Sequence, residues 1–445
     1  MSRIVPLLAF FSAAGGSAAC AADAIPGKGF QVERYTVALR PDLATTAVSG
    51  TETIVVESLS DGLARLSFTP NALRIEGAMV DGAPVEATSN AQALVFTLPR
   101  PLRRGGKATL SFRMSGRPAR GVAAIPSGLY TGYFACDWMV CLQDSPGDKA
   151  DFALDLFLPA GARSASVGRA EPAKILPGGL MLHRWRSTRP YSPYLYAFAA
   201  GAFARRTSKT GVGELTYLGA AAAGDDLGRL FAEAPAAAAF LAEKAGLNLP
   251  DRRYVQILVP GDEAQESAGF SLIGKAHLDG EKADRSNGWA IVHEMAHSWW
   301  GNLVTCATWR DFWLNEGIAT FMVAAWKEHR YGEAAYRDEL TGARRRVERV
   351  RALGFDKPLA WPGKYPSLGA RRAVQYSKGA LFLARLRETI GDAAFWDGLR
   401  RFTRLHAGGT VTSRDFQAAM ERSSRRDLSA LFGEWVYGDG DASGA

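Results

Sequence analysis

Residues 293–297 read HEMAH, and this stretch contains the residue types that bind zinc. Two histidines four positions apart share one face of a helix, so His293 and His297 can aim their imidazoles at one point with Glu294 beside them. A random chain of this composition would contain such a match on the order of 0.004 times. An ordinary helix face is therefore a poor explanation, and the stretch predicts half of a metal site.

A third ligand is required, because catalytic zinc takes three protein ligands and leaves one position open for water. Eighteen residues separate His297 from Glu316, which lies in the stretch WLNEGIATF. The apolar neighbours Trp313, Leu314 and Ile318 indicate that the Glu316 side chain points inward, where a carboxylate needs a metal or a cationic partner. Glu316 is the candidate third ligand.

Two helices are expected to position these ligands. The first begins with a cap at Ser286 or Asn287 and stops at Gly301, and the second runs from about residue 312 to 329. A strand at residues 254–259 precedes them, and most of the chain beyond that strand is predicted to be helical.

The first half of the chain has a different pattern. Polar and apolar residues alternate in KATLSFR (107–113) and DFALDLF (151–157), which is typical of half-buried antiparallel strands. The alternation ends near residue 205, and a chain of 445 residues is expected to form two or three domains. The sequence therefore predicts an all-β domain at residues 23–205 and a mixed, mainly helical domain at 206–445.

The segment HEMAHSWWGNLVTCATWRDFWLNEGIATF resembles the signature of the aminopeptidase N and leukotriene hydrolase family of gluzincin zinc metallopeptidases. The similarity includes H-E-x-x-H, the eighteen-residue spacing, the N-E-G context of the glutamate and the run G-N-L-V-T. AVQYSKGALF (373–382) is similar to the family segment that carries the catalytic tyrosine, and PYLYAFAAGAF (193–203) to the end of the family's N-terminal β domain.

The resemblance implies an α+β multidomain fold, with an N-terminal antiparallel β-sandwich or saddle domain followed by a thermolysin-like, mainly α-helical catalytic domain. It implies one zinc ion held by His293, His297 and Glu316, with Glu294 as general base. Tyr376 would donate a hydrogen bond to the oxyanion. The expected substrate is a peptide or protein.

One family motif is altered. Family aminopeptidases carry G-A-M-E-N, whose glutamate binds the free amino group, and counting without a gap places this motif over QESAG, residues 265–269. Ala268 then stands where the glutamate belongs, whereas Glu266 could replace it only if the loop shifts, and Gln265 and Gly269 complete the candidate substrate-binding segment. Aminopeptidase activity is the default expectation, and an endopeptidase or altered-specificity peptidase is the alternative.

Two further readings have less support. A zinc-binding protein that does not cut would have no need for Glu294, and epoxide hydrolysis has no separate support in the sequence. Residues 416–440 resemble the end of the family's catalytic domain, which implies a short form without the C-terminal helical domain and with a more open cleft.

The N-terminal residues predict export. Residues 1–22 have a positive charge at Arg3, then an apolar run, then small residues, which is the layout of a cleaved signal peptide. A lipidated Cys20 and a buried first element are the alternatives. No later apolar run reaches the roughly 18 residues that span a bilayer, so the expected product is periplasmic or secreted, with a membrane anchor only if Cys20 carries lipid.

Charge and cysteines add two expectations. The formal net charge is +8, but basic residues cluster only at residues 344–346, which a solvated helix face explains better than a nucleic-acid site. Cys136 and Cys141 either form a small disulfide or remain two thiols, with the disulfide slightly favoured, and Cys306 has no evident partner.

Overall fold

The first half of the chain folds into strands whose side chains alternate between a buried and an exposed face. The computed structural model describes residues 25–220, 226–284 and 287–438. Its largest sheet has nine strands in the order β13-β15-β11-β1-β2-β8-β4-β5, with β14 paired to β15, and it is antiparallel except for the β1–β11 pair. The strands are β1 (Phe30–Pro41), β2 (Val48–Ser58), β4 (Arg74–Val80), β5 (Ala83–Pro84), β8 (Lys107–Gly116), β11 (Asp151–Pro159), β13 (Arg169–Ala170), β14 (Lys174–Leu176) and β15 (Leu180–Arg186).

Two smaller sheets complete this β domain, in the orders β3-β7-β6 and β12-β16-β10-β9. Phe30, Phe68 and Phe96 belong to the buried cluster between the sheets. A disulfide joins Cys136 to Cys141 in the same cluster. The strands are β3 (Leu63–Phe68), β6 (Ala87–Ser89), β7 (Leu94–Leu102), β9 (Val122–Ile125), β10 (Gly128–Thr131), β12 (Arg163–Ser166) and β16 (Phe198–Gly201).

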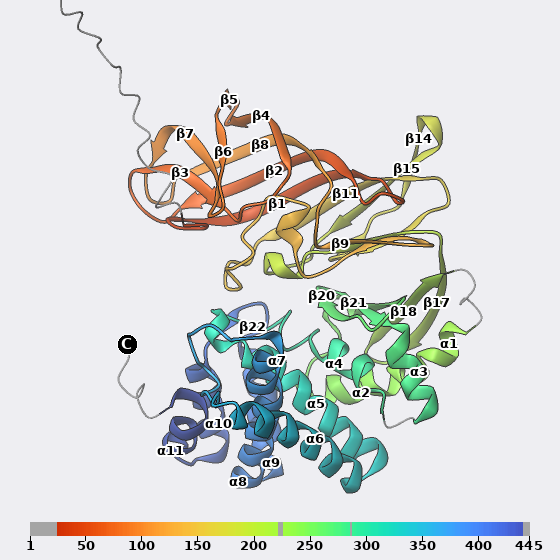
Figure 1. Cartoon of the computed structure of the whole chain (residues 1–445), viewed down its shortest axis with the longest axis vertical. Helices are drawn as coiled ribbons and strands as arrows, with labels where there is room; N and C mark the ends of the chain where they lie inside the picture. Colours follow the sequence, from red (N-terminus) through yellow and green to blue (C-terminus); the bar gives the residue numbers. More distant parts are fainter. Residues whose placement is uncertain (1–24, 221–225, 285–286, 439–445) are drawn as a thin grey trace, which may run out of the picture.

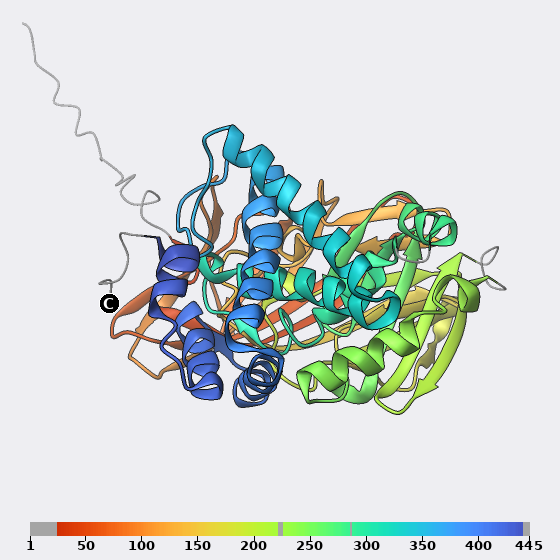
Figure 2. The ribbon, with the colours of Figure 1, turned by 90° about the horizontal axis from the view of Figure 1, so that it is seen from below.

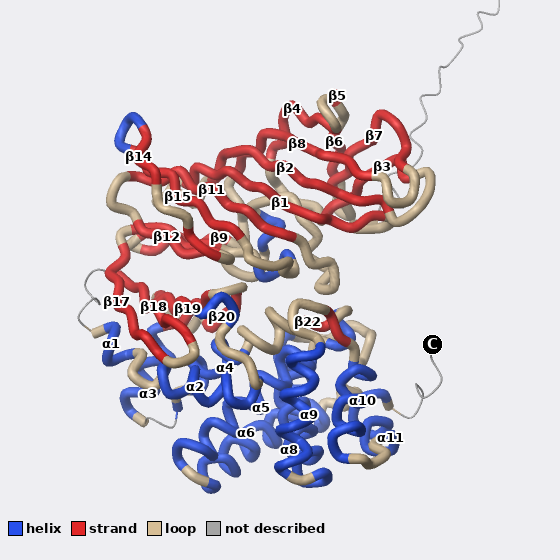
Figure 3. Tube along the Cα trace, turned by 180° about the vertical axis from the view of Figure 1, so that it is seen from behind, coloured by secondary structure: helices blue, strands red, loops and turns tan. Residues whose placement is uncertain are grey.

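The second half begins with a five-stranded mixed sheet in the order β17-β18-β19-β21-β20, so β20 lies at its edge. The predicted boundary at residue 205 falls inside β17. Figures 1 and 3 show this sheet facing the β domain on one side and helices on the other. The strands are β17 (Phe203–Thr210), β18 (Gly213–Ala220), β19 (Arg253–Val259), β20 (Ala264–Ser267) and β21 (Phe270–Gly274), with β22 (Thr305–Cys306) and β23 (Thr410–Val411) forming a separate pair.

Helices make up most of the rest, which confirms the predicted order of an all-β part followed by a mainly helical part. Helix α5 packs against α4, α6 and α8, and Figure 2 shows these helices crossing the centre of the molecule. The helices are α1 (Leu227–Leu230), α2 (Ala234–Ala245), α3 (Lys275–Ala283), α4 (Trp289–Ala296), α5 (Trp313–Tyr331), α6 (Glu333–Ala352), α7 (Leu368–Arg371), α8 (Gly379–Ile390), α9 (Asp392–Leu405), α10 (Ser413–Ser424) and α11 (Ser429–Phe432), with a π-helical turn at Arg372–Lys378.

The predicted start and end of the first ligand helix are wrong by a few residues. The helix begins after Gly288 rather than at Asn287 and ends before His297, because residues 297–299 form a turn instead of continuing the helix to Gly301. Ser286 and the predicted signal segment, including Cys20, lie outside the described residues. Among the described helices, none is long and apolar enough to cross a membrane.

Candidate active site

Helix α4 and the residue after it carry the first three candidate residues. His293 and Glu294 lie in α4 and His297 directly follows it, and all three side chains are buried. The helix is apolar on most sides because it packs between α2, α5 and the strands β20 and β21. Burial in the centre of the domain therefore fixes the direction in which these polar side chains point.

The three predicted zinc ligands converge. His293 Nε2 and His297 Nε2 lie 3.2 Å apart, and Glu316 Oε2 lies 3.3 and 3.4 Å from them. Zinc bonds of about 2.0–2.1 Å in a tetrahedron place ligand atoms roughly 3.3 Å from one another. The spacing of the donor atoms therefore fits a zinc ion.

The hydrogen bonding of the site also fits a metal. Oε2 of Glu294 and Oε2 of Glu316 are buried and accept no hydrogen bond. Buried carboxylate oxygens of this kind are costly unless a cation or a donor compensates them. A divalent cation among these oxygens would supply that compensation, so the chemistry of the donor set matches zinc.

A backbone turn orients the second histidine. His297 Nδ1 lies 3.0 Å from the carbonyl oxygen of Trp300, which places the donor hydrogen on Nδ1 and leaves Nε2 as the ligand atom. Gly301 has a φ of +126°, and a Cβ there would lie 2.9 Å from His297 Nδ1. Glycine is therefore required both by this backbone conformation and by the space beside the imidazole.

A close helix crossing brings Tyr376 to the ligands. Glu316 lies in the first turn of α5, and the next residue, Gly317, contacts Gly379 so closely that a Cβ on Gly379 would lie 2.8 Å from Gly317 Cα. Tyr376 stands three residues before Gly379, in the π-helical turn. Its ring lies parallel to that of His293, with centroids 6.0 Å apart.

The edge strand β20 supplies another carboxylate. Ligand atoms of Glu266, Glu294 and His297 all lie within 4.8 Å of one another. Gln265 Nε2 donates to Glu266 Oε2 at 2.8 Å and thereby helps to hold that carboxylate. Glu266 therefore faces the same point as the candidate zinc ligands.

Ala268 does not occupy that position, so the ungapped count misplaced the motif. Its side chain packs in the hydrophobic cluster of the β domain and its N–H donates to the carbonyl oxygen of Leu195. Gly269, with a φ of +86°, makes the turn into β21. Residues 264–267 read AQES, and aligning their Ala and Glu with those of G-A-M-E-N would have identified Glu266.

Burial and neighbouring charges change the acidity of these groups. Burial raises the pKa of Glu294 well above its usual range and that of Glu266 to about 7. Burial alone would lower the pKa of His297, but Glu316 and the two other carboxylates raise it to about 10. The cluster therefore attracts positive charge, and Glu294 is poised to accept and return a proton.

Tyr133 and Arg371 also border the site, although no spacing pattern marked them. Arg371 interacts electrostatically with Glu266 and Tyr376, and Glu266 contributes to the raised pKa of Tyr133. Tyr133 comes from the β domain and Arg371 from the end of α7. Only the folded chain brings them together, so local sequence held no signal for them.

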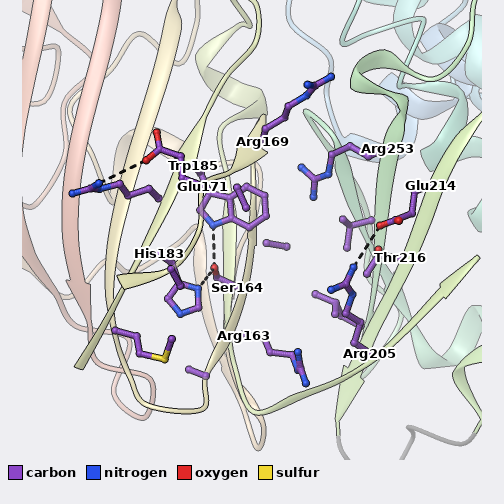
Figure 4. A pocket seen from close by; sticks show the side chains of 18 residues that line it. Arg163, Ser164, Arg169, Glu171, His183, Trp185, Arg205, Glu214, Thr216 and Arg253 are labelled. Atoms are coloured by element: carbon purple, nitrogen blue, oxygen red, sulfur yellow. Dashed lines mark hydrogen bonds and ion pairs between the residues drawn. The ribbon is translucent and has the colours of Figure 1, made fainter. Parts of the chain in front are cut away.

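A cavity of about 580 Å³ lies elsewhere, between the β domain and the five-stranded sheet (Figure 4). Trp185, His183 and Ser164 line one side, and Arg205 and Arg253 line the other. Ser164 Oγ accepts a hydrogen bond from Trp185 Nε1 at 3.0 Å. This cavity contains none of the predicted site residues, so it is not the candidate active site.

Comparisons with known proteins agree with this geometry. Residues 247–435 match the profile of the Peptidase family M1 domain. Leucine aminopeptidase 2 of Aspergillus oryzae is 28% identical over 67% of this chain and 50% of its own length. Aminopeptidase N of Lactococcus lactis subsp. lactis is 24% identical over 92% of this chain and 51% of its own length. The chain thus spans about half the length of these curated relatives.

A solved structure covers more of the fold. It is a mutant M1 zinc metallopeptidase from Deinococcus radiodurans bound to a Tyr-Ser-Ala substrate, with a TM-score of 0.75 and 26% identity. The similarity covers 93% of this chain and 95% of that chain. Both the β domain and the helical domain therefore have counterparts in that structure.

Proposed function

Because the chain belongs to peptidase family M1, we propose that it is a zinc-dependent aminopeptidase that removes N-terminal residues from peptides. One observation carries the exopeptidase part of this proposal. Glu266 converges with Glu294 and His297, so an anionic group for the substrate ammonium stands beside the residues that cut. The endopeptidase alternative rested on Ala268 and is not favoured.

Each residue of the site then has a task. Zinc held by His293, His297 and Glu316 would polarise the scissile carbonyl and make a water molecule acidic enough to attack it. Glu294 takes a proton from the attacking water and returns it to the leaving amine. Tyr376 donates a hydrogen bond to the carbonyl oxygen as that oxygen gains negative charge.

Glu266 sets where the cut falls. Its carboxylate binds the free ammonium group through charge-assisted hydrogen bonds, which are worth about 1.5–3 kcal/mol. A peptide with a blocked amine loses this contact and leaves a buried carboxylate without a partner. The geometry therefore favours removal of single residues from free N-termini.

The decisive experiment combines one variant with two forms of each substrate. Glu294→Gln is expected to retain one zinc ion, measured by elemental analysis, and to lose roughly 10²-fold or more in kcat because the general base is gone. Wild-type protein should shorten peptides with free N-termini and leave their acetylated copies intact in mass spectra. Glu348→Gln, an exposed position on α6, is the control expected to match wild type.

Two outcomes would contradict the proposal. Retained turnover in Glu294→Gln would exclude the proposed general base. Internal cleavage that ignores acetylation would exclude Glu266 as the group that limits cleavage to the first residue.

The site of action is proposed to lie outside the cytoplasm. The Cys136–Cys141 disulfide supports this, because disulfides persist in oxidising compartments, and so does the signal-like pattern of residues 1–22. Intact-mass analysis of protein from the cell envelope and medium should find the chain without those residues. An added acyl mass would identify Cys20 as a lipid anchor, and full-length protein confined to the cytoplasm would exclude export.

A further inference from the structure

A basic cavity adjoins the candidate active site. It has a volume of about 530 Å³ and is formed by residues that precede and face the π-helical turn. Its charged lining side chains are Arg310, Lys364, Arg371 and Asp144, so cations outnumber the single carboxylate. We call this cavity the basic pocket.

The basic pocket lies next to the residues that would hold the substrate. Gln375 lines it and immediately precedes Tyr376 in the chain. The ring of Phe312 lies 4.4 Å from the Arg371 guanidinium and 6.5 Å from the Tyr376 ring, so it separates the two by one side chain. The pocket is therefore lined by the residue that precedes the proposed oxyanion donor in the chain.

Tyr133 connects the pocket to the ammonium-binding group. It is a lining residue, and the carboxylate of Glu266 helps burial to raise the pKa of its hydroxyl to about 12. Arg371 in turn attracts Glu266. The Tyr133 ring also lies 6.1 Å from that of Tyr194, whose hydroxyl accepts from Asn315 Nδ2 at 3.1 Å, so the basic pocket opens beside the residue that precedes Glu316.

Arg371 is fixed in place by contacts with neighbouring side chains. Its Nε donates to Gln375 Oε1 at 2.9 Å, and its guanidinium lies 5.7 Å from the centre of the Trp309 ring as well as over Phe312. Across the described residues, Arg371 forms no ion pair, whereas Arg387 pairs with two carboxylates. Donors of Arg371 thus remain for a planar carboxylate, which a guanidinium binds with two parallel hydrogen bonds.

We propose that the basic pocket receives the side chain of the substrate's N-terminal residue and selects glutamate or aspartate there, with Arg371 as the specificity-determining residue. This inference rests on the proposed aminopeptidase function. An acidic N-terminal residue carries an ammonium and a carboxylate, and the site offers Glu266 to the first and Arg371 to the second. A lysine or arginine side chain would meet three cations and one carboxylate, so the same pocket disfavours it.

The strength of the contact between Arg371 and the substrate carboxylate sets the expected preference for glutamate. A charge-assisted hydrogen bond to a positioned guanidinium corresponds to a preference of about 10- to 100-fold in kcat/KM. Glutamine has nearly the shape of glutamate without its charge. The ratio of kcat/KM for glutamate to that for glutamine therefore measures the effect of the side-chain charge apart from that of its shape.

The test uses zinc-loaded full-length protein and tripeptides X-Ala-Ala, with X as Glu, Gln, Leu or Lys, each as a free acid and as a C-terminal amide. Wild type is expected to cleave the Glu peptide at least 10-fold more efficiently than the Gln peptide in both C-terminal forms. In Arg371→Met the ratio of kcat/KM for the Glu peptide to that for the Gln peptide should fall to about one. Arg345→Met, an exposed arginine on α6, is the control expected to keep the wild-type ratio.

The remaining outcomes are distinguishable. If wild type cleaves the Gln and Leu peptides with the same kcat/KM as the Glu peptide, this inference is overturned while the aminopeptidase function stands. The same holds if Arg371→Met keeps the wild-type ratio of kcat/KM for the Glu peptide to that for the Gln peptide. If kcat/KM depends on whether the C-terminus is amidated and not on the N-terminal residue X, the pocket binds the terminal carboxylate of short peptides, and the inference also fails. If wild type cleaves no peptide, the proposed function itself fails. Loss of the Leu activity in Arg371→Met, with a lowered melting temperature, would assign Arg371 a structural role.

Discussion

Tyr376 shows how much the site depends on the placement of single residues. Its ring is parallel to that of His293, and its side chain is half-buried. Burial raises the pKa of this hydroxyl well above its usual range, so it remains a hydrogen-bond donor throughout the neutral pH range. A donor that stays protonated can stabilise negative charge on the carbonyl oxygen at any pH at which the enzyme works.

Replacing Tyr376 with Phe is expected to lower kcat by roughly 10²- to 10³-fold, because one oxyanion donor is lost in the transition state. KM for a free peptide and the zinc content should stay near the wild-type values, because Glu266 and the three ligands are untouched. Steady-state kinetics and elemental analysis on the same preparation check both statements. A rise in KM with unchanged kcat would assign Tyr376 to substrate binding instead.

At this scale the sequence identified residues whose relationship is local. His293, Glu294, His297 and Glu316 are linked by fixed spacings on two neighbouring helices, so the motif was readable before the fold was known. The count gave Ala268 rather than Glu266 the place of the motif's glutamate, because the position of a residue on an edge strand depends on where the hairpin turns. That turn at Gly269 could not be located by counting from β19.

Among the elements, the crossing of α5 and α8 determines how close Glu316 and Tyr376 lie to each other. Gly317 and Gly379 contact each other through backbone atoms, with no side chain between the helices. Glu316 and Tyr376 stand on either side of this contact. Two small residues therefore set the separation between a candidate zinc ligand and the proposed oxyanion donor.

Gly379→Ala is expected to lower the free energy of unfolding by about 1–3 kcal/mol, because the added methyl group overlaps the backbone of α5. It should also lower kcat, since Tyr376 must shift. Gly342→Ala on α6 is the matched control, because only the far end of Arg346 lies near its Cβ position, and alanine there should stabilise the helix by about 0.5–1 kcal/mol. Urea unfolding of both variants measures the difference, and equal stability would mean that the helices separate at no cost.

Sequence periodicity predicted the type of most elements but not their partners. The alternation in residues 107–113 and 151–157 identified strands β8 and β11 correctly. It could not show that β11 pairs in parallel with β1, because a parallel neighbour leaves no mark on the alternation of a single strand. The π-helical turn that carries Tyr376 was equally invisible, since its residue pattern is that of an ordinary helix.

In the molecule as a whole, Lys149 ties the two domains together. It leaves the β domain and donates through Nζ to the carbonyl oxygens of Leu303 at 3.1 Å and Gly409 at 2.8 Å. Longer contacts reach the carbonyl oxygens of Asn302 and Gly408. One side chain thus holds two loops of the helical domain against the β domain.

Lys149→Met should lower the free energy of unfolding by about 2 kcal/mol, because several buried carbonyl groups lose their donor. Lys107→Met is the control, since Lys107 forms an exposed ion pair with Glu33 that is expected to contribute less than about 1 kcal/mol. Chemical unfolding followed by circular dichroism compares the two. Equal losses would show that the lysine contacts across the domain boundary are no stronger than a surface ion pair.

The strand that carries Glu266 also bears on solubility. β20 is the last strand of its sheet, and an open edge of this kind readily pairs with other chains. Here the β domain holds the residue after the strand, because the N–H of Ala268 donates to the carbonyl oxygen of Leu195 and its methyl group is buried in the neighbouring cluster. The contact that holds the end of the strand carrying Glu266 therefore also restricts access of other chains to that end of the open edge. A protease that cut between the domains would produce aggregation as well as inactivation.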